Sequence, residues 1–144
     1  MDILKTVTIG FLILESINVL TLYTSPGSKY ANAVGVFSAW EKSKAHPEMH
    51  DFVKYLVNWV AGTKLIFISL LVVILAVADE HILLFVAVAL IFSIHSFFWR
   101  MFPLVRKMDQ EGQVEPRNYS QLLGWMIRAF VLVFVAAVLA TLIG

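Results

Sequence analysis

The chain has 144 residues, of which 60% are hydrophobic and 15% are charged, and its formal net charge is +1. A soluble domain carries about 25% charged residues, so this composition is typical of an integral membrane protein and leaves no room for a separate soluble domain. The small net charge gives no basis for nucleic-acid binding, and the lack of cysteine excludes disulfides, thiolate metal sites, iron–sulfur clusters and cysteine nucleophiles.

Four hydrophobic segments follow one another along the chain, and each is long enough to cross a hydrocarbon core of about 30 Å. They occupy residues 3–23, 57–78, 82–102 and 122–143. We expect the first to be a retained span rather than a signal peptide, because Glu15 and Asn18 interrupt its apolar part. The sequence therefore predicts an all-α fold in which residues 1–144 form a single four-helix transmembrane domain.

Lysine and arginine residues are concentrated in the two long loops, which follow the first and third spans. The short connection at residues 79–81 and the C-terminal end have none, and the N-terminal end has only Lys5. The positive-inside rule therefore predicts cytoplasmic long loops, with both termini outside, in a multi-pass protein of the cell (inner) membrane.

The first long loop carries an apolar pattern with helical spacing. After a turn at residues 25–28, the side chains of Tyr30, Ala33, Val34 and Phe37 would share one face of a helix over residues 29–45. This pattern predicts an amphipathic helix on the cytoplasmic side, which lies either on the membrane surface or against the other cytoplasmic extensions.

The second and third spans are expected to extend beyond the membrane as helices. Pro47 suits the first turn of a helix, and residues 48–78 contain no breaker except Gly62. The third helix is expected to continue past Pro103, with a kink there, until Gly112 ends it. We therefore predict a membrane bundle with a helical collar on its cytoplasmic side.

Every span places a polar side chain at a similar depth, about 8–13 Å from its cytoplasmic end at 1.5 Å per residue. These residues are Glu15, Asn18, Lys64, His95 and Arg128. Charge that faces lipid costs at least about 2.5 kcal/mol, so we expect this polar layer to face the interior of the bundle. Glu15 would pair with Arg128 or Lys64, and the remaining positive charge, reinforced by Arg100, would hold a phosphate or carboxylate head group.

Metal and cofactor sites receive little support from the histidines. His46 and His50 are four residues apart, but His46 precedes Pro47 and is expected to lie outside the helix, so the two do not share a helix face. His95 is the one histidine inside a span, so no second intramembrane histidine faces it as a haem ligand. We therefore predict no metal, no cofactor and no catalytic residue.

Three functions remain open, because no sequence motif is specific enough to identify a family. The first is binding or transport of a small amphiphile or anion through the polar layer, with membrane lipids as partners. The second is a non-catalytic accessory or assembly subunit, for which a stripe of small residues at Gly62, Ser69 and Ala76 would suit packing in a homo-oligomer or against a membrane protein partner. The third is a membrane enzyme acting on a lipid-like substrate, with Glu15 and His95 as acid and base.

Overall fold

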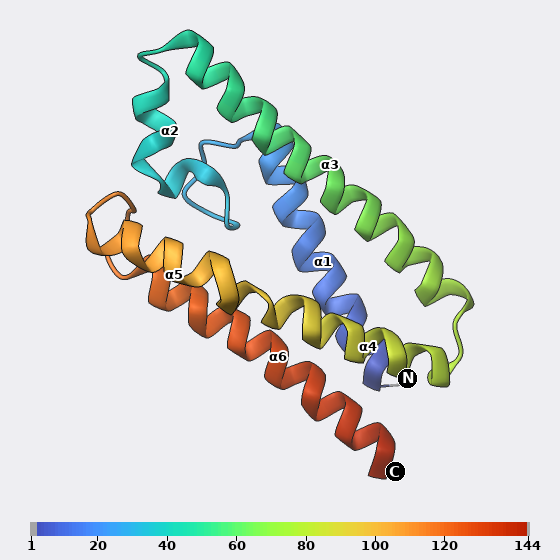
Figure 1. The fold of residues 1–144 in the computed structure, drawn as a ribbon. Helices are drawn as coiled ribbons and strands as arrows, with labels where there is room; N and C mark the ends of the chain where they lie inside the picture. The colour runs from blue at the N-terminus through green and yellow to red at the C-terminus, as the bar shows by residue number, and fades with distance from the viewer. Residues whose placement is uncertain (1–2, 144) are drawn as a thin grey trace.

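The computed structural model describes residues 3–143, which form helices and loops without a β-strand. In chain order the helices are α1 (Ile3–Thr24), the short 3₁₀ helix η1 (Val34–Val36), α2 (Ser38–Ser43), α3 (Pro47–Val77), α4 (Glu80–His95), α5 (Phe97–Gln110) and α6 (Tyr119–Ile143) (Figure 1). Helices α1, α3, α6 and the nearly continuous pair α4–α5 are each long and apolar enough to cross a membrane. The predicted all-α fold with four such helices is confirmed, and it indicates a multi-pass membrane protein.

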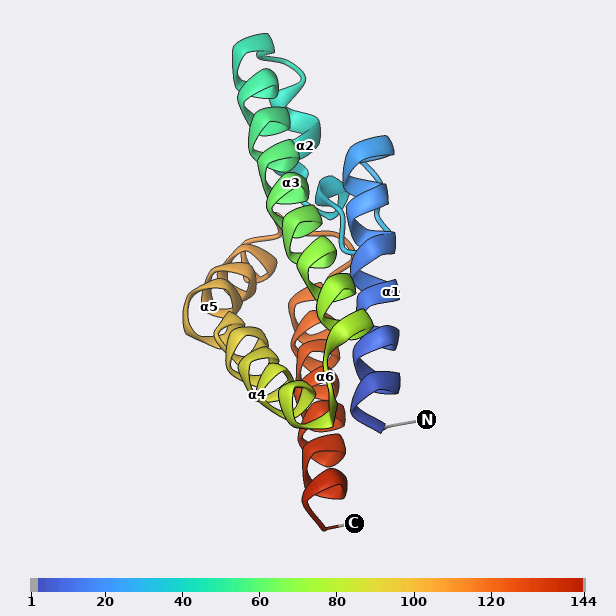
Figure 2. The same ribbon diagram turned by 90° about the vertical axis from the view of Figure 1, so that its right-hand side faces the viewer.

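Helix α1 lies at the centre of the arrangement. It packs against α3 on one side and against α4 and α6 on the other, whereas α3 packs mainly on α1 and α2 (Figures 1 and 2). The two long loops lie together at one end of the helices, and the turn between α3 and α4 lies at the opposite end, near the start of α1. The basic loops therefore share one end of the molecule.

The largest buried cluster joins all four spanning elements around Phe11. The Phe11 ring meets the rings of Phe67, Phe130 and Phe134 edge-on, at centroid distances of 6.4, 5.5 and 5.6 Å. Edge-to-face geometry is the favoured arrangement of aromatic pairs. The other buried members are Leu4, Leu71, Leu75, Leu83, Ala87, Leu90 and Ala137. These contacts determine how each helix is rotated about its own axis.

The third predicted helix is interrupted at Ser96, a break that the sequence did not predict. Pro103 lies inside α5, and the break separates α4 from α5. The Ser96 hydroxyl donates to the Ser93 carbonyl at 2.6 Å, and the Trp99 N–H donates to the Ser96 carbonyl in the tighter i to i+3 pattern. A serine hydroxyl that bonds back into the preceding turn competes with the backbone and bends a helix. The helical path then ends close to Gly112, as predicted, where φ is 71°.

Residues 29–45 do not form the predicted amphipathic helix. Only η1 and α2 are helical there, and Ala31 and Asn32 adopt left-handed backbone conformations with φ of 53° and 54°. Gly35 approaches the backbone of Gly27 so closely that a Cβ atom would overlap the Gly27 carbonyl oxygen. The buried side chains of this loop are divided between one cluster with α1 and α3 and another with α5 and α6. One straight helix face could not reach both clusters.

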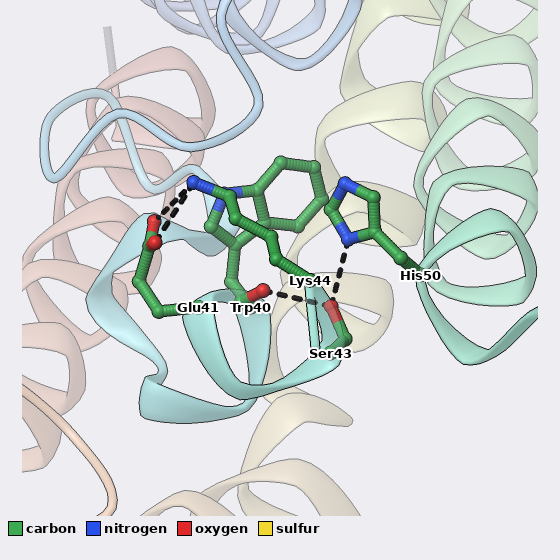
Figure 3. A network of polar contacts seen from close by, with 5 residues as sticks. All are labelled: Trp40, Glu41, Ser43, Lys44 and His50. Atoms are coloured by element: carbon green, nitrogen blue, oxygen red, sulfur yellow. Dashed lines mark hydrogen bonds and ion pairs between the residues drawn. The ribbon is translucent and has the colours of Figure 1, made fainter. Parts of the chain in front are cut away.

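Short-range contacts join α2 to the beginning of α3 (Figure 3). The Ser43 hydroxyl donates to the Trp40 carbonyl at 2.7 Å, which leaves its oxygen to accept from Nδ1 of His50 at 2.8 Å. The rings of Trp40 and His50 are 4.9 Å apart.

His46 is extended and α3 begins at Pro47, as predicted. Among residues 3–143, no group of three or more histidine or acidic side chains is arranged to hold a metal ion.

The second long loop is anchored to the start of α6 and to the first loop. The Asp109 carboxylate accepts the backbone N–H groups of Asn118 at 3.0 Å and Ser120 at 2.9 Å, and the Ser120 hydroxyl at 2.6 Å. It thereby satisfies donors that the first turn of a helix leaves unpaired. A single antiparallel bridge pairs Phe37 with Val114. The two loops therefore form one collar.

Candidate functional site

Three of the predicted site residues form a polar cluster between α1 and α3. The Lys64 Nζ atom lies 2.6 Å from Oε2 of Glu15 and donates to Oδ1 of Asn18 at 2.6 Å. The side chains of Lys64 and Glu15 are 30% and 21% exposed, and Asn18 is buried. Glu15 and Asn18 are three residues apart, so they face Lys64 from neighbouring turns of α1. Of the two partners proposed for Glu15, the structure places Lys64 beside it.

The cluster continues into the first loop and reaches α6. The Asn18 amide donates to the carbonyl oxygens of Ala31 at 2.5 Å and Asn32 at 3.2 Å. Ala31 and Asn32, which have left-handed backbone conformations, thus present two successive carbonyls to the side of α1. The Tyr119 hydroxyl in turn donates to Oδ1 of Asn32 at 2.7 Å. One hydrogen-bonded chain therefore joins α1, α3, the loop and α6.

A cavity of about 570 Å³ opens beside this polar cluster, between α1 and α6. Asn32 and Tyr119 line it at the collar, and Glu15, Asn18 and Lys64 add further polar groups to its wall. The rest of its wall is apolar and consists mainly of Leu14, Ile17, Leu122, Leu123, Met126 and Phe130. Its size lies within the range of about 300–1,000 Å³ that is typical of pockets for small molecules. The cavity therefore combines a hydrogen-bonding end with an apolar body.

Arg128 and His95 are not part of this cavity. They line a second cavity of about 390 Å³, together with Phe98, Val131 and Leu132. Successive residues of an α-helix are separated by about 100°, so Met126 and Arg128 lie about 200° apart around α6. The two cavities are therefore on opposite faces of α6, and the polar layer expected from the sequence is divided between them.

Arg100, the remaining predicted ligand residue, belongs to neither cavity. It is exposed, and its guanidinium carbon lies 5.9 Å from the centre of the Trp99 ring. The separation of Glu15 from His95 by α6 also means that the acid and base pair of the enzyme hypothesis is not assembled in this structure.

Sequence reasoning missed Asn32 and Tyr119. Tyr119 shares one face of α6 with Leu123, Met126 and Phe130, at the i, i+4, i+7 and i+11 spacing that could have identified it. Asn32 had no such signal, because its position depends on the left-handed turn of the first loop. Both residues extend the polar end of the cavity toward the collar.

Neither protein-family models, curated protein sequences nor solved structures include a match to this chain.

Proposed function

We propose that this chain is a membrane protein that binds a small amphiphile in the cavity between α1 and α6. The observation that supports this function is the polarity of that cavity, with the Glu15, Lys64 and Asn18 cluster at one end and an apolar wall elsewhere. A molecule with one polar end and one apolar end matches this division.

The same proposal includes an orientation in the membrane. Both long loops, which carry most of the basic residues, lie at one end of the helices. With that end in the cytoplasm, as the positive-inside rule favours, the polar end of the cavity lies in the cytoplasmic half of the bilayer. The apolar wall then continues toward the middle of the membrane, where an alkyl chain is most stable.

The charges of the polar end favour a head group without net charge. Lys64 is neutralised by Glu15 at 2.6 Å, and Lys29, which also borders the cavity, is paired with Glu115 at 2.6 Å. A phosphate or carboxylate would therefore meet no excess positive charge in this cavity. Hydroxyl and amide groups of a ligand would instead exchange hydrogen bonds with Asn32 and Tyr119.

An accessory or assembly function is the second candidate, and the exposed side of α3 favours it. Phe52, Tyr55 and Trp59 form an exposed aromatic row at the collar end of α3, with successive ring centres 6.4 and 6.3 Å apart. Helix α3 packs mainly on α1 and α2, so this row faces away from the bundle. Exposed aromatic patches of this kind are suited to binding another membrane protein.

Extraction and mass spectrometry of the purified full-length chain would test the amphiphile proposal. We expect an amphiphile to co-purify with the unaltered protein and to be lost from Met126→Trp, in which the larger side chain fills the cavity. Leu139→Trp is the matched control, because Leu139 is an exposed residue of the same helix that lines neither cavity. Equal retention by both variants would contradict the proposed cavity, and co-purification of a second polypeptide without an amphiphile would favour the accessory function.

A further inference from the structure

The second cavity has a feature that the amphiphile proposal does not use, namely an arginine without an acidic partner. Arg128 lies within α6, and no carboxylate among residues 3–143 forms an ion pair with it. No side chain or backbone oxygen of these residues accepts a hydrogen bond from it either. An arginine inside a membrane span is costly unless its charge is matched.

Aromatic rings surround the Arg128 guanidinium group. Its central carbon lies 5.1 Å from the centre of the Phe98 ring, 5.8 Å from Phe102 and 5.1 Å from Trp125. Gly124 permits this arrangement, because a Cβ atom at that position would lie 2.8 Å from the Phe102 ring. The rings hold the guanidinium group at the boundary between α5 and α6.

These ring contacts leave the donors of Arg128 available for an anion. Cation–π contacts use the faces of the aromatic rings, whereas the five N–H groups point outward in the guanidinium plane. A phosphate group can accept two of these N–H groups in parallel, which gives short and strong bonds. The aromatic rings also exclude water from one side of such a pair.

The surroundings of Arg128 indicate where the rest of the ligand would lie. Val131 and Leu132 follow Arg128 along α6, away from the collar, and line the same cavity. They are about 4.5–6 Å further from the collar at 1.5 Å per residue. The charged group is therefore on the collar side, and the apolar wall is on the side of the membrane centre. A phospholipid has the same order, with its head group at the membrane surface and its acyl chains toward the centre.

We propose that Arg128, its aromatic neighbours and the adjoining cavity form a binding site for the phosphate group of an anionic membrane phospholipid. The acyl chain lies along Val131 and Leu132, and His95 borders the head group from α4. This site is separate from the cavity between α1 and α6, which has balanced charges and takes the uncharged head group. Basic pockets between spanning helices at the cytoplasmic side are suited to anionic head groups.

Native mass spectrometry of the full-length chain in mild detergent would test this site with phosphatidylglycerol and phosphatidylcholine of identical acyl chains. Both lipids offer a phosphate, but the choline cation of phosphatidylcholine cancels its charge and is repelled by Arg128. We therefore expect the unaltered protein to bind phosphatidylglycerol about tenfold more tightly, which corresponds to about 1.4 kcal/mol. Arg128→Leu should remove this preference. Arg128→Lys should retain only part of it, because lysine keeps the positive charge but lacks the planar pair of donors. Arg100→Leu is the matched control and should keep the preference, because Arg100 is exposed and lines neither of the two cavities.

One further variant and one competition experiment complete the test. Val131→Trp retains the arginine but fills the cavity, so it should also lose the preference, even if Arg128→Leu does not fold. Excess inorganic phosphate should leave phosphatidylglycerol bound, because the acyl chain contributes to binding. An unchanged preference in folded Arg128→Leu or in Val131→Trp would overturn the proposal, and displacement by inorganic phosphate would overturn its assignment to a lipid.

Discussion

The ion pair between Lys64 and Glu15 should stabilise the folded bundle, and replacement of Lys64 by methionine tests this directly. Loss of one partner of a fully buried ion pair costs about 3–5 kcal/mol. Here the side chains of Lys64 and Glu15 remain 30% and 21% exposed, so water compensates part of the loss. Lys64→Met also removes the hydrogen bond to Asn18, which contributes about 1 kcal/mol. We therefore expect Lys64→Met to lower the free energy of unfolding by about 2 kcal/mol.

A double-mutant cycle distinguishes this pair from two independent contributions. Unfolding in mixed micelles of increasing sodium dodecyl sulfate content, followed by tryptophan fluorescence, would give the free energies of Lys64→Met, Glu15→Gln and the double variant. We expect the double variant to be more stable than the sum of the single losses predicts, with a coupling energy of about 1 kcal/mol or more. Additive losses within about 0.5 kcal/mol would refute the reasoning.

Lys54→Met is the matched control for this experiment, because Lys54 lies in the same helix. Its Nζ atom is 3.8 Å from Oδ1 of Asp51, and the two side chains are 51% and 77% exposed. Exposed ion pairs of this kind contribute little, so the change should be below about 0.5 kcal/mol. A loss as large as that of Lys64→Met would show that the assay reports charge removal in general.

Two other features of the collar make separate predictions. Gly35→Ala should open the first loop, because the new Cβ would overlap the Gly27 carbonyl. Limited proteolysis should then cleave this loop faster than in the unaltered protein. Gly10→Ala is the control and should not increase cleavage, because a Cβ at Gly10 meets nothing within 4 Å. Equal cleavage would contradict the close packing of the loop. The hydrogen bond and charge of Lys29 lower the pKa of Glu115 below its ordinary value. This contact therefore stabilises the collar at pH values above the ordinary pKa and is lost as the pH falls through the lowered pKa. A carboxyl titration followed by NMR should show the Glu115 pKa rising toward its ordinary value in Lys29→Met, and no change would argue against the contact.

The positions of the spanning helices were predictable because hydrophobic length depends on composition. The expected spans 3–23 and 122–143 differ from α1 and α6 by a few residues at their ends. The start of α3 at Pro47 was also predictable, because proline suits the first turn of a helix and disfavours helical backbone before it.

The division of the polar layer was not predictable from depth. Depth is measured along a helix axis, whereas membership of a cavity depends on the direction around that axis. For α6, Phe130 and Phe134 pack on Phe11 of α1, while Gly124 packs on Phe102 of α5. These contacts turn Arg128 away from Glu15. They involve side chains distant in sequence, so periodicity within one segment could not reveal them.

The first loop shows a different limit. Its apolar residues have helical spacing, but they serve two separate clusters, and Ala31 and Asn32 turn the chain between helix α1 and α2. Tertiary contacts therefore determined the backbone where local propensity favoured a helix.

The central place of α1 has a consequence for the biogenesis of the protein. Helix α1 precedes α3, α4 and α6 in the chain and contacts all three, so each later helix finds at least one of its partners already synthesised. Helix α3 can dock on α1 before α4 is made, which would bring Lys64 to Glu15 early and cover two charges before the last helix enters the membrane. The cavity between α1 and α6, in contrast, is completed only by the final helix. A ligand-binding function would therefore appear at the end of assembly, after the two charges in its wall are matched.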